Sequence, residues 1–453
     1  MANKNLYINT GKAIPLFLSL VVSSIMFLIP DSRSTAFFAL QTPVGTMALD
    51  KVFILLTFSI VALLCFSEKT FFNVSNTIKI FFLYVSWVFV SSLISLFANG
   101  YFQINNLFFL FVVNFMTFLI GYILSCRYIN FKLYLRRAII VFGLANSIFM
   151  IFQHYYNDPL LIADYLRGTG ERGFYMDGVR ISRVWGFQGE PLAAAATIMV
   201  AILFLFDSTF FREQKNKKII LLLKLVSLTS MFFALSYTYS RGSLLSLSIA
   251  LLYYLFKKKI KLFTLKRVII FTISVPFLIL FLFLRGLSFE SSTFERFGQL
   301  SHDASFFARW TIITDVWSIS QSFGAKIILG LGTGASNGIR YLTGGALDNQ
   351  YLNIYYENGL IAIILVVLLF IGALRKKADI VFKAAIVGII FNMTTYEIFY
   401  YSSAGTMIWL LMGVVTSQTR AAVKSKANIE DTNVNYISEK KKRKTKRKYR
   451  IVL

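Results

Sequence analysis

The chain has 453 residues, of which 57% are hydrophobic and 15% are charged, and its formal net charge is +26. A water-soluble chain carries roughly a quarter charged residues, so this composition excludes an ordinary soluble enzyme. The basic residues lie in short gaps between apolar runs and in one terminal segment, not along one soluble face, which argues against a nucleic-acid-binding protein.

Apolar runs long enough to cross a bilayer core as helices recur along residues 1–420. They predict an all-α polytopic membrane protein with about twelve transmembrane helices. The predicted helices begin near Ala13, Ala48, Ile78, Leu107, Leu135, Pro191, Leu225, Ser243, Val268, Leu360, Ile380 and Tyr400.

The lysine and arginine clusters of the short connecting segments indicate the orientation. They fall in alternate segments, as the positive-inside rule expects of the cytoplasmic side. Both termini are therefore predicted to be cytoplasmic. Lys224 falls within the start of one predicted helix, from which its side chain is expected to reach back toward the cytoplasmic side.

Two segments on the predicted outer side, 154–190 and 287–359, are too long to be simple connectors. The second contains a predicted amphipathic helix at 307–320 that would lie on the membrane surface. It also contains Gly330-Leu-Gly-Thr-Gly334, which we predict to be a flexible turn because no strand precedes it. Residues 421–453 are predicted to be a disordered cytoplasmic tail, held by anionic lipids or simply solvated.

Basic residues of the predicted outer side are nearly all arginine. Arginine grips phosphate or carboxylate at two points, so its enrichment favours an anionic ligand at the outer face. The alternative is that these arginines pair with nearby acids such as Glu171, Asp177 and Glu295. The outer arginines are Arg33, Arg167, Arg172, Arg180, Arg183, Arg241, Arg285, Arg296, Arg309 and Arg340.

Arg241 lies in Tyr239-Ser-Arg-Gly-Ser243, at the turn between two predicted helices. The basic residues that bound this pair, Lys224 and Lys257, leave fewer than the ~20 residues usual for each crossing. The turn is therefore predicted to be recessed into the outer leaflet. An arginine at that depth is costly and needs a partner or a ligand.

A second motif is Arg183-Val-Trp-Gly-Phe-Gln-Gly-Glu190-Pro191. Pro191 fits the first turn of a helix, and Glu190 is placed as its cap. Capping alone would explain Glu190. If the helices pack suitably, Arg183 would lie just above the membrane and close to Arg241.

A third motif starts a helix at Asp348-Asn349. Asp348 can cap this helix, and Asp348, Tyr351 and Tyr355 are expected on one helical face. A carboxylate among aromatic residues suits a general base, whereas the alternative is a helix cap with two tyrosines at the membrane interface.

The three motifs, in this order, resemble the O-antigen polymerase (Wzy) and O-antigen ligase superfamily. The resemblance rests on Ser240-Arg-Gly242, on Arg183-x-x-Gly186 before Glu190-Pro191, and on the long loop. In that loop the matching pieces are Arg296, Asp303, Arg309-Trp, Gly330–Gly334, Asp348-Asn-x-Tyr-Leu and Glu357-x-Gly359-Leu. Ligase relatives place His where Asp348 stands, which favours the polymerases.

The resemblance implies a metal-independent, inverting glycosyltransferase in the bacterial cytoplasmic membrane, with no cofactor. It would transfer a growing glycan from undecaprenyl diphosphate to a lipid-linked repeat unit, for O-antigen, capsule or exopolysaccharide. Expected partners are the undecaprenyl-diphosphate-linked oligosaccharide, membrane lipids and a chain-length regulator, and no nucleic acid. The implied catalytic residues are Asp348, Arg241 and Arg183, and the implied substrate-binding residues are Arg309, Glu190, Tyr351, Trp185, Arg296 and Glu357.

Two alternatives remain at the level of sequence. One is a ligase-type transferase, and the other is a flippase of lipid-linked oligosaccharide. A flippase usually carries charged residues near the membrane midplane, whereas the predicted helices are almost free of charge.

Overall fold

A computed structural model describes residues 2–29, 40–42, 45–47, 49–67, 75–99, 104–156, 173–176, 179–207, 217–258, 326–335 and 348–417, with a few positions between 311 and 324. The predicted helix near Val268, Arg296, Arg309 and the tail at 421–453 lie outside the described residues. The amphipathic helix predicted at 307–320 is described only in part, and its described positions are helical.

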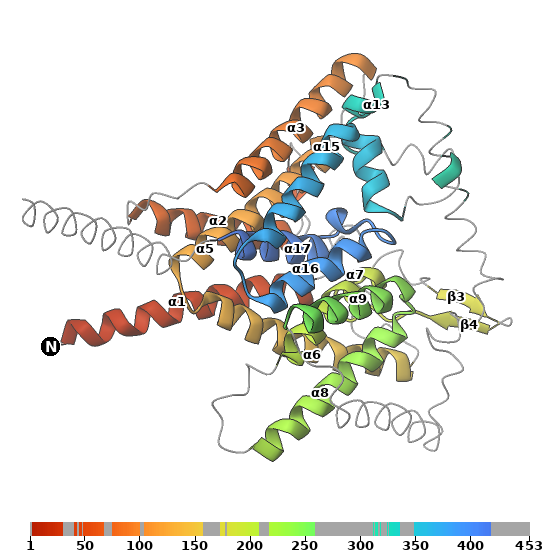
Figure 1. Cartoon of the computed structure of the whole chain (residues 1–453). Helices are drawn as coiled ribbons and strands as arrows, with labels where there is room; N and C mark the ends of the chain where they lie inside the picture. Colours follow the sequence, from red (N-terminus) through yellow and green to blue (C-terminus); the bar gives the residue numbers. More distant parts are fainter. Residues whose placement is uncertain are drawn as a thin grey trace, which may run out of the picture.

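The first half of the described chain is a run of apolar helices (Figure 1). These are α1 (Ala2–Phe27), α2 (Leu49–Ser67), α3 (Asn76–Asn99), α4 (Ile104–Leu110), the π-helix η1 (Phe111–Met116), α5 (Thr117–Arg127) and α6 (Phe131–Tyr156). Two short antiparallel hairpins accompany the helices. They are β1 (Leu40–Thr42) with β2 (Gly45–Met47), where Leu40 pairs with Met47, and β3 (Gly173–Met176) with β4 (Val179–Ser182), where Gly173 pairs with Ser182.

The second half continues with α7 (Pro191–Phe206), α8 (Lys217–Tyr237), α9 (Arg241–Lys257), the short α13 (Lys326–Leu329), α15 (Gln350–Arg375), α16 (Ile380–Asn392), the 3-10 helix η6 (Ile398–Tyr400) and α17 (Ser402–Thr416). Apart from the one near Val268, every helix predicted from the sequence coincides with a helix of the described chain.

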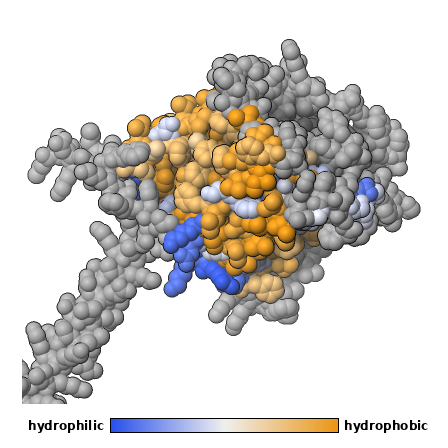
Figure 2. Space-filling view, turned by 90° about the horizontal axis from the view of Figure 1, so that it is seen from above, coloured by the Kyte–Doolittle hydropathy of each residue, from blue (hydrophilic) through white to orange (hydrophobic). Residues whose placement is uncertain are grey.

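The described helices have the character of a membrane protein. Five are long and apolar enough to cross a membrane: Asn76–Phe97, Leu107–Arg127, Phe131–Tyr156, Lys218–Tyr237 and Gln350–Arg375. Large apolar side chains such as Phe17, Leu63 and Leu83 are exposed, and Figure 2 shows a broad apolar face with hydrophilic residues toward its margins. The predicted α-helical membrane class is confirmed.

The helices at the centre are shorter than those around them. α7 has 16 residues, α16 has 13 and α17 has 15, whereas α3 has 24 and α6 and α15 have 26 each. Every residue of α17 is buried. At about 1.5 Å per residue, these central helices span at most about 24 Å, less than the ~30 Å hydrocarbon core.

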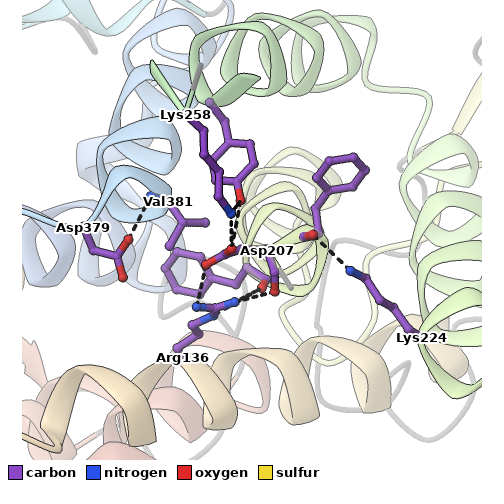
Figure 3. Close-up of polar contacts among 9 residues, drawn as sticks. Arg136, Asp207, Lys224, Lys258, Asp379 and Val381 are labelled. Atoms are coloured by element: carbon purple, nitrogen blue, oxygen red, sulfur yellow. Dashed lines mark hydrogen bonds and ion pairs between the residues drawn. The ribbon is translucent and has the colours of Figure 1, made fainter. Parts of the chain in front are cut away.

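A buried ion cluster ties together one end of α6, α7 and α9 (Figure 3). Arg136 pairs with Asp207 (Nη1 to Oδ2, 2.8 Å) and donates to the carbonyl oxygens of Phe204 and Asp207, groups that the end of α7 leaves without helical partners. The other carboxylate oxygen accepts from Lys258 at 2.9 Å and from Tyr254 at 2.8 Å.

The environment of this cluster favours its charges. Partial burial by itself would lower the pKa of the Lys258 ammonium. Its hydrogen bonds with Tyr254 and Asp207 have the larger effect, so the pKa is raised above its ordinary value. Lys224 of α8 donates to the carbonyl oxygen of Phe206 at 3.0 Å, so its side chain reaches the end of α7 where the ion cluster lies. The cluster fixes one end of the central helices, and the candidate site lies at the other end.

Candidate functional site

The turn between α8 and α9 is strained and buried. Thr238, Tyr239 and Ser240 are each no more than 5% exposed, and Tyr239 has a φ of 55°. A bulky residue rarely adopts this left-handed conformation, which persists only where the surrounding structure imposes it. Ser240 caps α9 by accepting from the Ser243 amide at 3.3 Å. Arg241 is therefore the first helical residue, at a fixed height.

Arg183 is held against the same turn. Its Nε donates to the carbonyl oxygen of Thr238 at 2.9 Å, and the amide of Val184 donates to the carbonyl oxygen of Tyr237 at 3.4 Å. The segment before α7 therefore runs beside the turn before α9. The expected proximity of the Arg183 segment to the Arg241 turn is found.

The segment between Arg183 and α7 is anchored by α6. Gln153 accepts from the amide of Gly186 at 2.8 Å and donates to its carbonyl oxygen at 3.2 Å, while Asn146 accepts from the amide of Phe187 at 2.9 Å. Gly186 has a φ of +62°, and a side chain there would overlap Asn146. These contacts hold the Arg183 segment in one conformation.

Glu190 and Trp185 differ in part from their expected roles. Glu190 occupies the N-cap position of α7 with Pro191 at N1, but its carboxylate makes no capping hydrogen bond and is 7% exposed. Trp185 is 5% exposed and packs against Phe149 and Phe187. Little of its ring is left for a sugar to stack on.

The cap of α15 is Asn349, which corrects the prediction that Asp348 caps this helix. The Asn349 side chain accepts from the amides of Tyr351 and Leu352 at 3.0 and 3.1 Å. Aspartate and asparagine both cap helices well. Asn349 is the cap because it directly precedes the first helical residue, Gln350. Asp348 therefore lies one residue before the cap and two before the first helical residue, half-buried and without the capping role.

The turn after α16 joins the two motifs. Asn392 donates to the hydroxyl of Ser243 at 2.7 Å, and a side chain at Gly242 would overlap Thr395. The same turn receives the start of α15, which places Asp348 and the Arg241 turn against one common support. Three bonds make that second contact, namely the amide of Gln350 to the carbonyl oxygen of Met393 (2.9 Å), Asn349 Nδ2 to that of Thr394 (3.0 Å) and the Tyr351 hydroxyl to that of Ile390 (2.9 Å).

A further carboxylate at this end was missed from the sequence. Glu397 is half-buried in the segment between α16 and α17 and accepts from Asn353 Nδ2 at 3.1 Å. The signal was the polar run Thr394-Thr-Tyr-Glu397 between two apolar helices, which sequence reasoning treated as a simple connection. Glu397 is a second candidate for a general base.

The glycine-rich segment Gly330–Gly334 is buried and hydrogen-bonded, not a flexible turn as predicted. The amides of Leu331 and Gly332 donate to the carbonyl oxygens of Tyr356 and Glu357 at 2.9 and 2.8 Å, and Thr333 lies 2.7 Å from the hydroxyl of Ser92. Gly359, with a φ of 76°, interrupts α15 at this point and makes room for the segment.

Glu357 lies inside this packing. It is 1% exposed and accepts a hydrogen bond from the hydroxyl of Tyr400. The expected substrate-binding role would require an open position, and Glu357 instead lies beneath the site as a support.

The arrangement combines arginines, carboxylates and helix N-termini at one end of the molecule. Arg183 and Arg241 supply positive charge, and α7, α9 and α15 all begin here, so their dipoles favour anions. Asp348 and Glu397 supply groups that can accept a proton. Such a site suits a reaction in which a phosphorylated group gains negative charge. Arg309 and Arg296 lie outside the described residues.

The fold and site define an α-helical membrane protein with a polar site where α7, α9 and α15 begin. No protein-family model matches the chain, and no curated protein matches it.

Proposed function

We propose that the chain is a polymerase that transfers a growing glycan from undecaprenyl diphosphate to a lipid-linked repeat unit, at the outer face of the bacterial cytoplasmic membrane. Both termini lie in the cytoplasm, and about twelve helices cross the membrane. The product is an O-antigen, a capsule or an exopolysaccharide.

The observation that carries the proposal is the shared support of three motifs. The Asn392–Thr395 turn contacts both the Arg241 turn and the start of α15, and Arg183 is bonded to the former. Three segments far apart in sequence that carry the proposed catalytic residues are therefore connected by these contacts, which supports the proposal. The lysine-bearing ion cluster at the opposite ends of α6, α7 and α9 agrees with a cytoplasmic position for that end.

The reaction needs a base and a stabiliser of the leaving group. The acceptor sugar hydroxyl attacks the anomeric carbon of the donor, and the new C–O bond forms as the bond to the diphosphate breaks. The proton passes to a carboxylate, Asp348 or Glu397, and the bonding electron pair leaves with the diphosphate. Arg241 and Arg183 stabilise the charge that develops there, most strongly in the transition state. Inversion at the anomeric carbon follows by analogy with the resembled family.

The test is the surface glycan of the source strain after deletion of this gene and complementation with variants. Wild type should restore a ladder of polymerised repeats, while Arg241→Ala should leave single repeat units at an unchanged protein level in the membrane. Full-length glycan stranded on the lipid carrier in the deletion strain would indicate a ligase. Repeat units retained inside the cell would indicate a flippase, and either result would overturn the proposal.

A further inference from the structure

A groove lies between α3 and the segment formed by α4 and η1. Its volume is about 550 Å³. Four of its lining residues, Phe89, Val90, Ile104 and Phe111, are between 41% and 50% exposed and form its open side. Tyr84, Val88, Leu110 and Asn114 are buried and form its floor. The lining is apolar except at Tyr84, Ser86 and Asn114.

The wall of the groove is built of stacked rings. Phe111 stacks on Phe115 at 4.9 Å between centroids, Phe115 on Phe81 at 5.7 Å, and Phe81 on Phe118 at 3.8 Å. The π-helical turn at Phe111–Met116 gives this wall its local geometry, and π-turns inside α-helices are frequent at functional sites. Through Phe81 and Phe118, which are buried, these stacked rings join the wall of the groove to the core.

The groove has the depth of half a membrane. Ile104 and Asn114 are ten residues apart on one helical segment, which corresponds to about 15 Å of helix rise and half of the ~30 Å hydrocarbon core. Both walls belong to helices apolar enough to cross a membrane. The occupant is therefore a hydrocarbon chain that enters from one leaflet, the outer one in the proposed orientation.

The groove is continuous with the packing under the candidate site. Trp87 and Ser91 of α3, the helix that supplies Tyr84 and Val88 to the floor, donate to the carbonyl oxygen and the side-chain oxygen of Asn358 at 2.8 and 3.0 Å, and Asn358 adjoins Glu357. Glu357 is bonded to Tyr400 of η6, and α4 packs against η6. η6 directly follows Glu397. A chain in the groove would thus have its outer end beside the segment that carries this carboxylate.

We propose that the groove binds the isoprenoid chain of the lipid carrier next to its phosphate end. This inference rests on the proposed function. A volume of about 550 Å³ holds roughly 18 groups of the size of a water molecule or a methylene, at ~30 Å³ each. That is room for the first isoprene units, which would fix the height of the diphosphate before Arg241 and Arg183.

The experiment measures binding to the full-length protein in detergent micelles, with a fluorescent polyprenyl phosphate as probe. Unlabelled undecaprenyl phosphate should displace the probe at a concentration at least about tenfold lower than phosphatidylglycerol, a difference of ~1.4 kcal/mol. Displacement by both lipids at equal concentration would show an ordinary acyl-lipid site and overturn the proposal.

Two variants of α3 locate the binding. Val90→Trp fills the groove and should weaken probe binding about tenfold. The control is Leu83→Trp on the same helix. Leu83 is 58% exposed and does not line the groove, so this variant should bind the probe as wild type does. Ile104→Trp serves as a second filling variant if Val90→Trp fails to elute as a monodisperse protein. Wild-type affinity in a folded filling variant would overturn the groove assignment.

The binding assay and the glycan assay can contradict the two proposals independently of each other. A strain that makes its full ladder without this protein, while the protein still prefers undecaprenyl phosphate, overturns the polymerase and leaves the groove. A restored ladder without chain preference overturns the groove alone.

Discussion

Arg183 donates from Nε to the carbonyl oxygen of Thr238 at 2.9 Å, which fixes a guanidinium from the segment before α7 onto the turn before α9. The bond uses the one guanidinium nitrogen that lies within the side chain, so the planar end of Arg183 is oriented as well as placed.

Arg183→Lys should therefore lose function although it keeps the charge. Lysine lacks Nε and the planar fork, and its ammonium cannot both bond Thr238 and present two parallel donors to a phosphate. We expect kcat/KM for repeat-unit polymerisation in membranes to fall about 10- to 100-fold, or ~1.4–2.7 kcal/mol of transition-state stabilisation. Activity of Arg183→Lys near wild type would show that charge alone is needed there.

Asp348→Asn and Asn349→Ala should separate chemistry from folding at adjacent positions. Asn349 makes both capping bonds of α15, so Asn349→Ala should lower the stability of the protein by about 1 kcal/mol. Asp348→Asn removes a proton acceptor without touching the cap, so if Asp348 is the base it should abolish turnover while α15 keeps both capping bonds.

Glu397→Gln is the comparison that decides the base. If Asp348→Asn retains full turnover while Glu397→Gln has none, the proton passes to Glu397. Polymer length on a gel and unfolding of the purified variants in detergent give the two readouts.

Gly359→Ala should disrupt the part of α15 that precedes Gly359. Its φ of 76° disfavours a side chain, and an added Cβ would overlap the carbonyl of Ile328. Gly324→Ala is a matched control, since Gly324 has a φ of 55° but no heavy atom within 4 Å of the added Cβ. We expect the control to show only the ~1–2 kcal/mol cost of the left-handed backbone, and Gly359→Ala to yield less folded protein after extraction. Equal losses would mean that backbone strain, not contact with the Gly330–Gly334 segment, requires Gly359.

Asp207→Asn should be strongly destabilising. It leaves Arg136, buried between α6 and α7, facing an amide in place of a carboxylate, and breaking a buried ion pair costs about 3–5 kcal/mol. Asp379 is an exposed acidic residue that caps α16 through the amide of Val381, and Asp379→Asn keeps the capping group (Figure 3). Heating in detergent followed by size-exclusion chromatography should show early loss of the Asp207 variant only.

The sequence predicts those features of the fold whose causes are local. Pro191 starts α7 because proline suits the first helical position, and the helix predicted from Leu360 begins where Gly359 interrupts α15. The turn before Arg241 could be predicted because it separates two apolar helices, α8 and α9.

Contacts between distant segments could not be predicted. The burial of Gly330–Gly334 depends on Ser92 and Ser95 of α3, more than 200 residues earlier, to which Thr333 and Leu331 are bonded. Whether Asp348 or Asn349 caps α15 depends on a register difference of one residue. The position of Glu397 beside the site could not be predicted either, because it depends on the contact between the turn after α16 and the start of α15.

Gly359 divides α15 into an N-terminal part and a longer C-terminal part. The N-terminal part is bonded to the turn after α16 and, through Asn358, to Trp87 and Ser91 of α3, and the C-terminal part also packs on α3, where Gly372 meets Thr77. The backbone hydrogen bonds at the division hold the Gly330–Gly334 segment against α15, and the close approach that they need leaves no room for a side chain at position 359. A substitution at position 359 would therefore act in two directions at once, on the turn that supports the candidate site and on the pairing of α15 with α3.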